Sequence, residues 1–352
     1  MIQLDRNIVS GILAAQTGPD LYYYLKEAVK LEHSTIPPYL TAMFSLKPGV
    51  NQRVAQLIKS IVVEEMLHMT IASNILIAIG GHPEINTQGF VPDYPGPLPL
   101  DIGGLKVGIE AFTIPLVDKV FRAIEQPEEE VPVHPPTLGL AEVEPEFATI
   151  GAFYDAIKKK IVDLGPGIFV HKTAPPQVVS NRWFPKEKLF PITDPVSACR
   201  AIDLIKLEGE GTSVTPFQAP GDPAHFYKFG EILEGREVVV TPTGFSYNGA
   251  AVLFDPSGVW PLRPNCKIAD FAAGTQARTR IEAFAYSYST LLNALHDVFN
   301  TKPDTLDAAI GMMYDLRVLA VALFQTDTGD GSGQTVGPSF EYVNVQGGMR
   351  FS

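Results

Sequence analysis

The sequence contains little cysteine: Cys199 and Cys266 are its two cysteines in 352 residues. Two cysteines so far apart build neither a disulfide framework nor the CxxC pattern of a metal site. The chain is therefore expected to fold around a hydrophobic core alone, and its length is sufficient for that.

Long apolar runs and an excess of positive charge are also absent. No run of about 18 apolar residues occurs, which argues against a membrane partner. The formal net charge is −12. Nucleic acid is therefore not an expected partner, because binding phosphates requires clustered Lys and Arg. The first residues, Met1–Arg6, lack the basic start and apolar middle of a signal peptide, so we expect a cytoplasmic protein.

The N-terminal part predicts two long helices, over residues 20–46 and 51–79, joined by a tight turn. Asp20 and Asn51 are suitable N-caps, and apolar residues recur at helical spacing behind each of them. Pro37-Pro38 is expected to kink the first helix, because Pro37 removes a backbone donor. Two such helices form an antiparallel hairpin.

The remaining chain alternates helices with loops rich in Pro and Gly. Further helices are predicted at 112–125, 150–162, 195–209, 222–233, 276–299 and 304–325, with short strands within 236–270, such as 237–240 and 251–254. Two of these helices start with Asp-Pro, at Asp194 and Asp222. We expect a mainly α fold divided into residues 1–235, a metal-binding bundle with a loop-rich insertion at 82–193, and 236–352, a short β segment followed by two C-terminal helices packed on the bundle.

Acidic residues and a histidine lie on the apolar faces of the first helix pair. Glu32 and Glu65 follow the apolar stripes of their helices, and His68 lies one turn after Glu65. A carboxylate that faces a core is costly unless it is paired or binds a metal. Both glutamates are about equally far from the turn at Pro48, so they are expected at the same depth. Glu64 is an alternative to Glu65 if the helix is rotated.

A second set of acidic residues and a histidine follows later in the chain. Glu210 and Asp222 lie about equally far from the turn between their helices, and His225 comes three residues after Asp222. Helical spacing from Ile205 favours Glu208 over Glu210. Asp222 reads equally well as an N-cap, and His225 as a core histidine.

Two carboxylate-and-histidine units are typical of a carboxylate-bridged dimetal site. Carboxylate and imidazole ligands suit iron or manganese. The expected cofactor is therefore iron, as one or two ions, with manganese as the alternative.

Several segments resemble the ferritin-like family named for iminophenyl-pyruvate dimer synthase of the violacein and rebeccamycin pathways. The two specific ones are Leu31–Leu40 (LEHSTIPPYL) and Glu64–Met69 (EEMLHM). Further matches are Ile79–Pro83, Thr149–Tyr154, Glu208–Thr212, Ala224–Phe229 and Leu291–His296, so that the resemblance covers most of the chain.

The resemblance implies a ferritin-like helical bundle, and it assigns a set of metal ligands. Carried over by position, these are Glu32, Glu65, His68, Glu210, Asp222 and His225. The family pattern prefers Glu210 over Glu208. It also has Glu where this chain has Asp222 and Ala152.

Taken together, these features favour a non-haem iron oxidoreductase of specialised metabolism. Such an oxidase or oxidative coupling enzyme would act on a small organic substrate, for which the resemblance suggests an imine derived from an aromatic amino acid. Two alternatives stay open: a ferroxidase or iron-storage protein, and a ferritin-like module without catalysis. The sequence leaves assembly into a homo-oligomer open.

Overall fold

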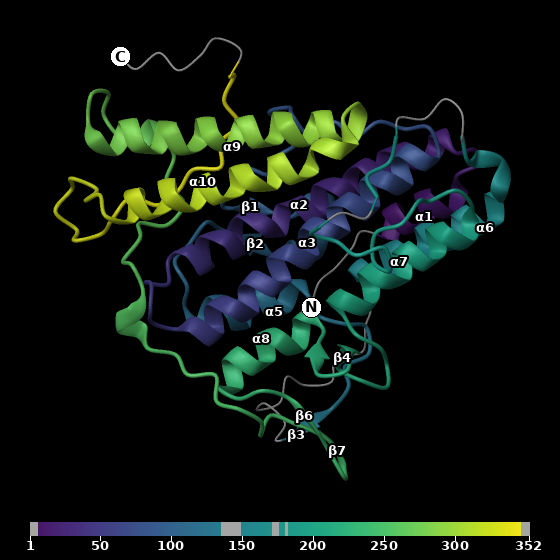
Figure 1. Ribbon diagram of the computed structural model, residues 1–352, viewed down its shortest axis with the longest axis horizontal. Helices are drawn as coiled ribbons and strands as arrows, with labels where there is room; N and C mark the ends of the chain where they lie inside the picture. The colour runs from purple at the N-terminus through teal and green to yellow at the C-terminus, as the bar shows by residue number, and fades with distance from the viewer. Residues whose placement is uncertain (1–5, 135–148, 171–175, 180–181, 346–352) are drawn as a thin grey trace.

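Two antiparallel helices, α2 (Tyr22–Phe44) and α3 (Gln52–Ala78), form the centre of the fold in the computed structural model (Figure 1). The structure describes residues 6–134, 149–170, 176–179 and 182–345. From Leu31 in α2 and from Glu64 in α3 onward almost every residue is buried, because other helices cover the pair on both sides. The predicted hairpin is therefore confirmed, and its polar residues lie in the interior of the protein.

The helix starts differ in detail from the sequence prediction. Asp20 precedes α2 in a 3-10 turn, Pro19–Leu21, where its carboxylate accepts hydrogen bonds from the N–H groups of Gln16 and Thr17. Asn51 is the residue before α3, but its side chain does not cap the helix. Instead it exchanges hydrogen bonds with the backbone of Asp255 at 2.7 and 2.9 Å, which fixes the distant loop around that residue.

The helix α2 continues through Pro37-Pro38 and ends at Phe44. The hydroxyl of Tyr94 donates to the carbonyl of Ser34, at 2.6 Å, in place of the backbone N–H that Pro38 lacks. Both prolines are buried, and packing around them maintains the helical path. By length and composition α3 is apolar enough to cross a membrane, but 89 % of its most apolar window is buried inside the protein, as in a core helix.

The helices of the chain lie on two sides of this central pair (Figure 1). On one side α9 (Gln276–Asn300) and α10 (Leu306–Phe324) pack on each other and on α2 and α3. On the other side α7 (Pro195–Gly209) and α8 (His225–Glu234) contact α3. Next to α7 lies α6 (Ile150–Leu164), and α1 (Arg6–Ala14), which the sequence did not predict, packs against α6.

The helical segment predicted at 112–125 consists of three short pieces. They are α4 (Ile114–Leu116), a π-helical turn at Val117–Phe121, and α5 (Arg122–Ile124). The hydroxyl of Thr113 accepts the N–H of Leu116 and starts the segment. Because α5 packs against α8, the segment ends beside the central pair.

The described strands are short and lie at the periphery. The antiparallel pairs are β1 (Gly96–Pro97) with β2 (Lys106–Val107) and β4 (Phe217–Ala219) with β5 (Asp222–Pro223). A three-stranded sheet has the order β3-β7-β6, in which β3 (Val133–His134) is parallel to β7 (Gly244–Ser246) and β6 (Val239–Thr241) is antiparallel to it. The strand predicted at 251–254 is wrong, because only an isolated bridge from Ala251 to Arg236 forms there.

The two Asp-Pro signals have different outcomes. Asp194 is the N-cap of α7, as predicted, and its carboxylate accepts the N–H of Ser197 at 2.7 Å. The Ser197 side chain completes a capping box. Asp222-Pro223 instead forms β5, and α8 begins at His225. The physical reason is the tight turn at Gly221, with φ +76°, which pairs this stretch with β4.

The mainly helical fold class is confirmed. The division at residue 235 stays a prediction. The loop-rich insertion is described except for residues 135–148, 171–175 and 180–181, and the prediction for these lies outside the described residues.

A buried glutamate connects α8 to the β6–β7 hairpin and makes stability depend on pH. Glu231 accepts the N–H of Val238 at 2.9 Å, and its other oxygen is 4.0 Å from Arg53. Burial raises the pKa of Glu231 to about 7. Its stabilising contribution is therefore complete below the unfolded pKa, near 4.5, and is lost as the pH rises through 7. Glu231→Gln removes this loss, and at pH 8 we expect it to raise the free energy of unfolding relative to wild type by on the order of 2 kcal/mol.

Urea denaturation of both proteins between pH 5 and pH 8 measures this difference. Glu234→Gln, at the partly exposed end of the same helix, is the matched control and should follow the wild-type curve. A constant difference between Glu231→Gln and wild type over this range would contradict the assignment.

Candidate metal centre

Five buried side chains from four segments meet between α2, α3 and α8. They form two groups that share one member: Glu32, Glu65 and His68 in the first, and Glu65, Glu125 and His225 in the second. Within each group the candidate ligand atoms all lie within 4.8 Å of one another. Glu125 is the residue that directly follows α5, and His225 is the first residue of α8.

The two histidines present the same ring nitrogen to the carboxylates. Nδ1 of His68 is 3.6 Å from Oε2 of Glu32 and 3.8 Å from Oε1 of Glu65. Nδ1 of His225 is 3.0 Å from the same Oε1 of Glu65 and 3.4 Å from Oε2 of Glu125. The imidazole rings stack with centroids 5.5 Å apart. One oxygen of Glu65 therefore lies between two histidine-and-glutamate pairs.

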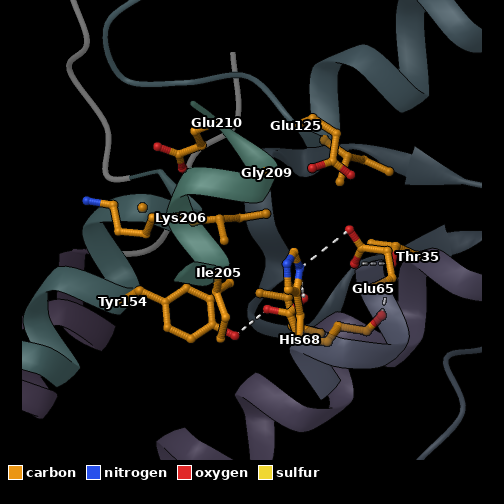
Figure 2. A pocket seen from close by; sticks show the side chains of 14 residues that line it. Thr35, Glu65, His68, Glu125, Tyr154, Ile205, Lys206, Gly209 and Glu210 are labelled. Atoms are coloured by element: carbon orange, nitrogen blue, oxygen red, sulfur yellow. Dashed lines mark hydrogen bonds and ion pairs between the residues drawn. The ribbon is translucent and has the colours of Figure 1, made fainter. Parts of the chain in front are cut away.

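A hydroxyl group holds the other oxygen of each of the three carboxylates. Tyr154 donates to Oε1 of Glu32, and the Thr35 hydroxyl lies 2.9 Å from Oε2 of Glu65 (Figure 2). Tyr39 donates to Oε1 of Glu125 at 2.6 Å. Burial raises the pKa of both tyrosines well above the ordinary value, so each keeps the proton that it donates. Each carboxylate thus has one fixed oxygen and one that faces a histidine.

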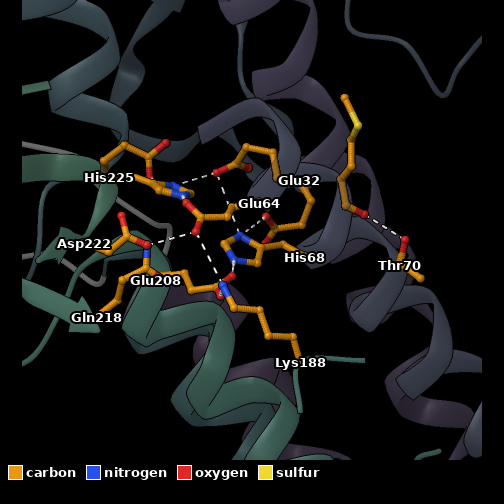
Figure 3. Close-up of polar contacts among 12 residues, drawn as sticks. Glu32, Glu64, His68, Thr70, Lys188, Glu208, Gln218, Asp222 and His225 are labelled. Atoms are coloured by element: carbon orange, nitrogen blue, oxygen red, sulfur yellow. Dashed lines mark hydrogen bonds and ion pairs between the residues drawn. The ribbon is translucent and has the colours of Figure 1, made fainter. Parts of the chain in front are cut away.

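The outer nitrogens of the histidines contact a second pair of carboxylates (Figure 3). Nε2 of His68 lies 2.9 Å from Oε2 of Glu208, and Nε2 of His225 lies 3.1 Å from Oε2 of Glu64. Since a carboxylate accepts, each Nε2 carries a hydrogen, which leaves Nδ1 as the nitrogen that faces the site. Metal-binding histidines in proteins are commonly oriented in this way.

Two lysines neutralise this second pair of carboxylates. Nζ of Lys228 is 2.7 Å from Glu64, and Nζ of Lys188 is 2.5 Å from Glu208. Burial by itself raises the pKa of Glu64, but the hydrogen bonds and charges of His225 and Lys228 lower it well below its usual range. Each histidine is thus the start of a His–Glu–Lys chain, one through Glu208 and the other through Glu64.

The charges of the site favour a divalent cation. Five buried carboxylates (Glu32, Glu64, Glu65, Glu125 and Glu208) lie near two lysines. Burial lowers the pKa of His68, yet the surrounding glutamates outweigh this and raise it to about 10. Burial also raises the pKa of Glu65 to about 7, with the charge of Glu125 adding to it. The negative charge that holds protons on these groups also attracts a metal cation. The oxygen and nitrogen donors present suit iron or manganese.

A family comparison agrees with this arrangement. The model of the ferritin-like family matches residues 25–234, which is more than half of the chain and includes all five side chains. The chain belongs to the ferritin-like family.

A solved structure gives the same result for the fold. A ferritin-like protein from Caulobacter vibrioides superimposes with a TM-score of 0.60, over 92 % of this chain and 99 % of that chain, at 21 % sequence identity. At this identity the likeness concerns the fold. No curated protein matches the sequence.

The fold of the present chain brings together four of the six ligands that were predicted from its sequence. Glu32, Glu65, His68 and His225 lie in the two groups, whereas Glu210 and Asp222 lie outside both. Asp222 is 45 % exposed and pairs with Lys228 at 3.1 Å, so it supports the second pair of carboxylates from outside. Ligation of a metal by the six residues stays a prediction.

The alternatives that the sequence left open have distinct positions in the structure. Glu208 is fully buried and bonds His68, in agreement with its helical spacing, while Glu210 is half-buried at the end of α7. Burial raises the pKa of Glu210 to about 7. Glu64 bonds the outer nitrogen of His225, so Glu65 is the member of that pair that faces the site.

Glu125 was missed by the sequence reasoning. Its signal was present, because it lies four residues after the buried Phe121 and thus on the apolar face of a predicted helix. The same signal identified Glu32. Only the π-helical turn before it and the bond from Tyr39 show how it reaches the site.

A small cavity lies against the two groups. It encloses about 40 Å³ and is lined by Glu32, Glu65, His68, Glu125, Tyr154 and Glu210 among others (Figure 2). This volume accommodates water-sized molecules, whereas organic ligands occupy pockets of several hundred Å³. An organic molecule therefore needs a different binding surface near the centre.

Substitutions at Glu125 and Asp222 should have different effects on metal binding. We expect Glu125→Gln to weaken binding of one of two ions by at least about tenfold, because an amide is a poor ligand. Asp222→Asn, which changes a side chain outside both groups, should keep the wild-type stoichiometry. Titration with Mn(II) followed by elemental analysis measures both. Equal losses in the two variants would refute this assignment of the second group.

Proposed function

We propose that this protein is a non-haem iron oxidoreductase with a carboxylate-bridged pair of irons. The observation that carries the proposal is Oε1 of Glu65, which lies within 3.8 Å of Nδ1 of His68 and 3.0 Å of Nδ1 of His225. Glu32 with His68 would hold one ion and Glu125 with His225 the other, and Glu65 would serve both. Manganese is the alternative metal, since the same donors suit it.

A bound iron pair would supply the reduction of O2 or peroxide that is coupled to oxidation of a substrate. The protein's own residues prepare the site for this chemistry. Tyr39, Tyr154 and Thr35 fix one oxygen of each carboxylate, and the His–Glu–Lys chains fix the imidazoles. Because these contacts are buried, the donors need little rearrangement when an ion binds.

A groove beside the centre supports a small organic substrate. The groove encloses about 520 Å³ between α3 and residues 183–188, a size typical of ligand pockets. Trp183 and Phe184 line it together with Lys59 and Lys188. Glu64 also lines the groove, and its Oε2 lies 3.1 Å from Nε2 of His225.

Aromatic and cationic side chains together fit a flat molecule that carries a negative charge. This agrees with the imine of an aromatic amino-acid derivative suggested by the resemblance to the iminophenyl-pyruvate dimer synthase type. We therefore propose an oxidase or oxidative coupling role in specialised metabolism, acting on a dissolved small molecule in the cytoplasm.

Anaerobic titration with Fe(II) followed by exposure to O2 tests this function. We expect about two irons per chain and new absorption bands after O2, because the two groups share a bridging carboxylate. Glu65→Ala should lose both ions, since Glu65 belongs to both groups. Wild-type protein that binds no iron would overturn the proposal. Iron uptake far above two ions in a shell-sized assembly would indicate storage instead.

Removal of the metal should also lower the thermal stability. A ligand that binds only the folded state stabilises it by mass action, by about 2.7 kcal/mol at a concentration one hundred times its Kd. Differential scanning calorimetry with and without a chelator should therefore show a lower Tm for chelated wild type. Glu65→Ala is the control and should be insensitive to chelator. An insensitive wild type would point to a module without a working site.

A further inference from the structure

An enclosed apolar cavity lies on the side of α2 and α3 that faces away from the metal centre. It encloses about 50 Å³ between these helices and the C-terminal pair α9 and α10. Met66 and Met69 of α3, Leu292 and Phe299 of α9, and Ile310 and Met313 of α10 form much of its wall. Protein interiors contain few voids of this size, so the cavity is a feature to be explained.

The polar groups in the wall leave almost nothing for water to bind. The hydroxyl of Thr70 donates to the carbonyl of Met66 at 2.8 Å (Figure 3), and the hydroxyl of Tyr288 is bonded to Nε2 of His33 at 2.8 Å. Nδ1 of His33 is the one buried polar side-chain atom of this wall without a partner among the described residues. A buried water needs two to four polar partners, and the mostly apolar wall offers few of them, so it favours an apolar occupant over water.

The wall contains no Asp, Glu, Lys or Arg side chain, and its one imidazole, that of His33, is bonded through Nε2 to the hydroxyl of Tyr288. The other lining residues are apolar, apart from the two hydroxyl groups that are already bonded. Methionine side chains adapt their shape and are polarisable, which favours contact with a small apolar molecule.

The cavity and the metal centre share the same two helices. His33, Met66 and Met69 line the cavity, and each directly follows a residue of the centre, namely Glu32, Glu65 and His68. The two sets lie on different faces of these helices because successive helical residues are rotated by about 100°, and α9 and α10 cover one face while α7 and α8 pack on another. The cavity is therefore separated from the centre by one layer of helices.

We propose that this cavity binds a small apolar molecule of the size of dioxygen. Its volume excludes organic substrates, its wall without charged side chains disfavours ions, and its apolar contacts favour an apolar diatomic gas. Binding depends on the cavity alone. Only a role as a store of O2 for the centre rests on the proposed function.

Dissolved O2 itself serves as the probe, because it is paramagnetic and enhances the relaxation of nearby nuclei. The chain is labelled with 13C at its methionine methyl groups and is kept free of iron. Under O2 pressure, we expect the enhancement at Met66, Met69 and Met313 to be on the order of threefold larger than at Met43 and Met312, which lie outside the cavity wall. Equal enhancement at all five methyl groups would overturn the proposal.

Two leucine variants provide the matched control. Leu292→Phe fills the cavity and should abolish the excess enhancement, whereas Leu253→Phe makes the same change at a side chain that is 77 % exposed and should preserve it. If Leu292→Phe does not fold, Leu292→Ala enlarges the cavity and should increase the enhancement. A relaxation enhancement in Leu292→Ala at or below the wild-type value would contradict O2 binding in the cavity.

Glu65→Ala separates this proposal from the proposed function. Its metal binding should be lost while the O2 enhancement at the three methionines is kept. Failure of iron binding in wild type would thus leave the cavity result intact. Loss of the cavity signal in wild type would likewise leave the metal result unaffected.

Discussion

The cost of burying carboxylates governs the architecture of this protein. An ionised carboxylate that leaves water loses its hydration, and only hydrogen bonds, opposite charges or a metal compensate for this. Here the oxygens of Glu32, Glu65 and Glu125 contact hydroxyl groups and imidazoles, while Glu64 and Glu208 contact lysines. The carboxylates and their partners come from α2, α3, α6, α7, α8, the residue after α5 and the loop that carries Lys188, so the centre forms only when all of these segments are in place.

The central helix pair meets two different demands on its two sides. One side presents acidic groups and histidines to α7 and α8, and the other presents methionines and leucines to α9 and α10. This accounts for the burial of α3, whose composition alone would suit a membrane. The polar side holds its groups in fixed positions through hydrogen bonds. The apolar side is packed less completely and leaves a cavity.

The sequence predicted the parts of the centre that depend on local geometry. Helical spacing put Glu32, Glu65 and His68 on inward faces, and it placed Glu208 inward as well. The N-cap at Asp194 was also predictable, because its donor and acceptor lie within four residues. Asp222 had the same local signal, but a tight turn and the pairing of β4 with β5 outweighed it. Asn51 was likewise used for a contact with Asp255, distant in sequence.

The sequence by itself determined that the protein is a helical bundle with carboxylates and histidines facing its interior. A helix fixes the direction of each side chain relative to its neighbours, so one residue's face follows from the spacing of the others. Only the tertiary structure decided that Glu125 joins His225, that Glu64 and Glu208 lie behind the histidines, and that Glu210 and Asp222 lie outside. These choices depend on how separate helices pack. A rotation or shift of one helix changes distances by several ångströms, and no local pattern of residues records it.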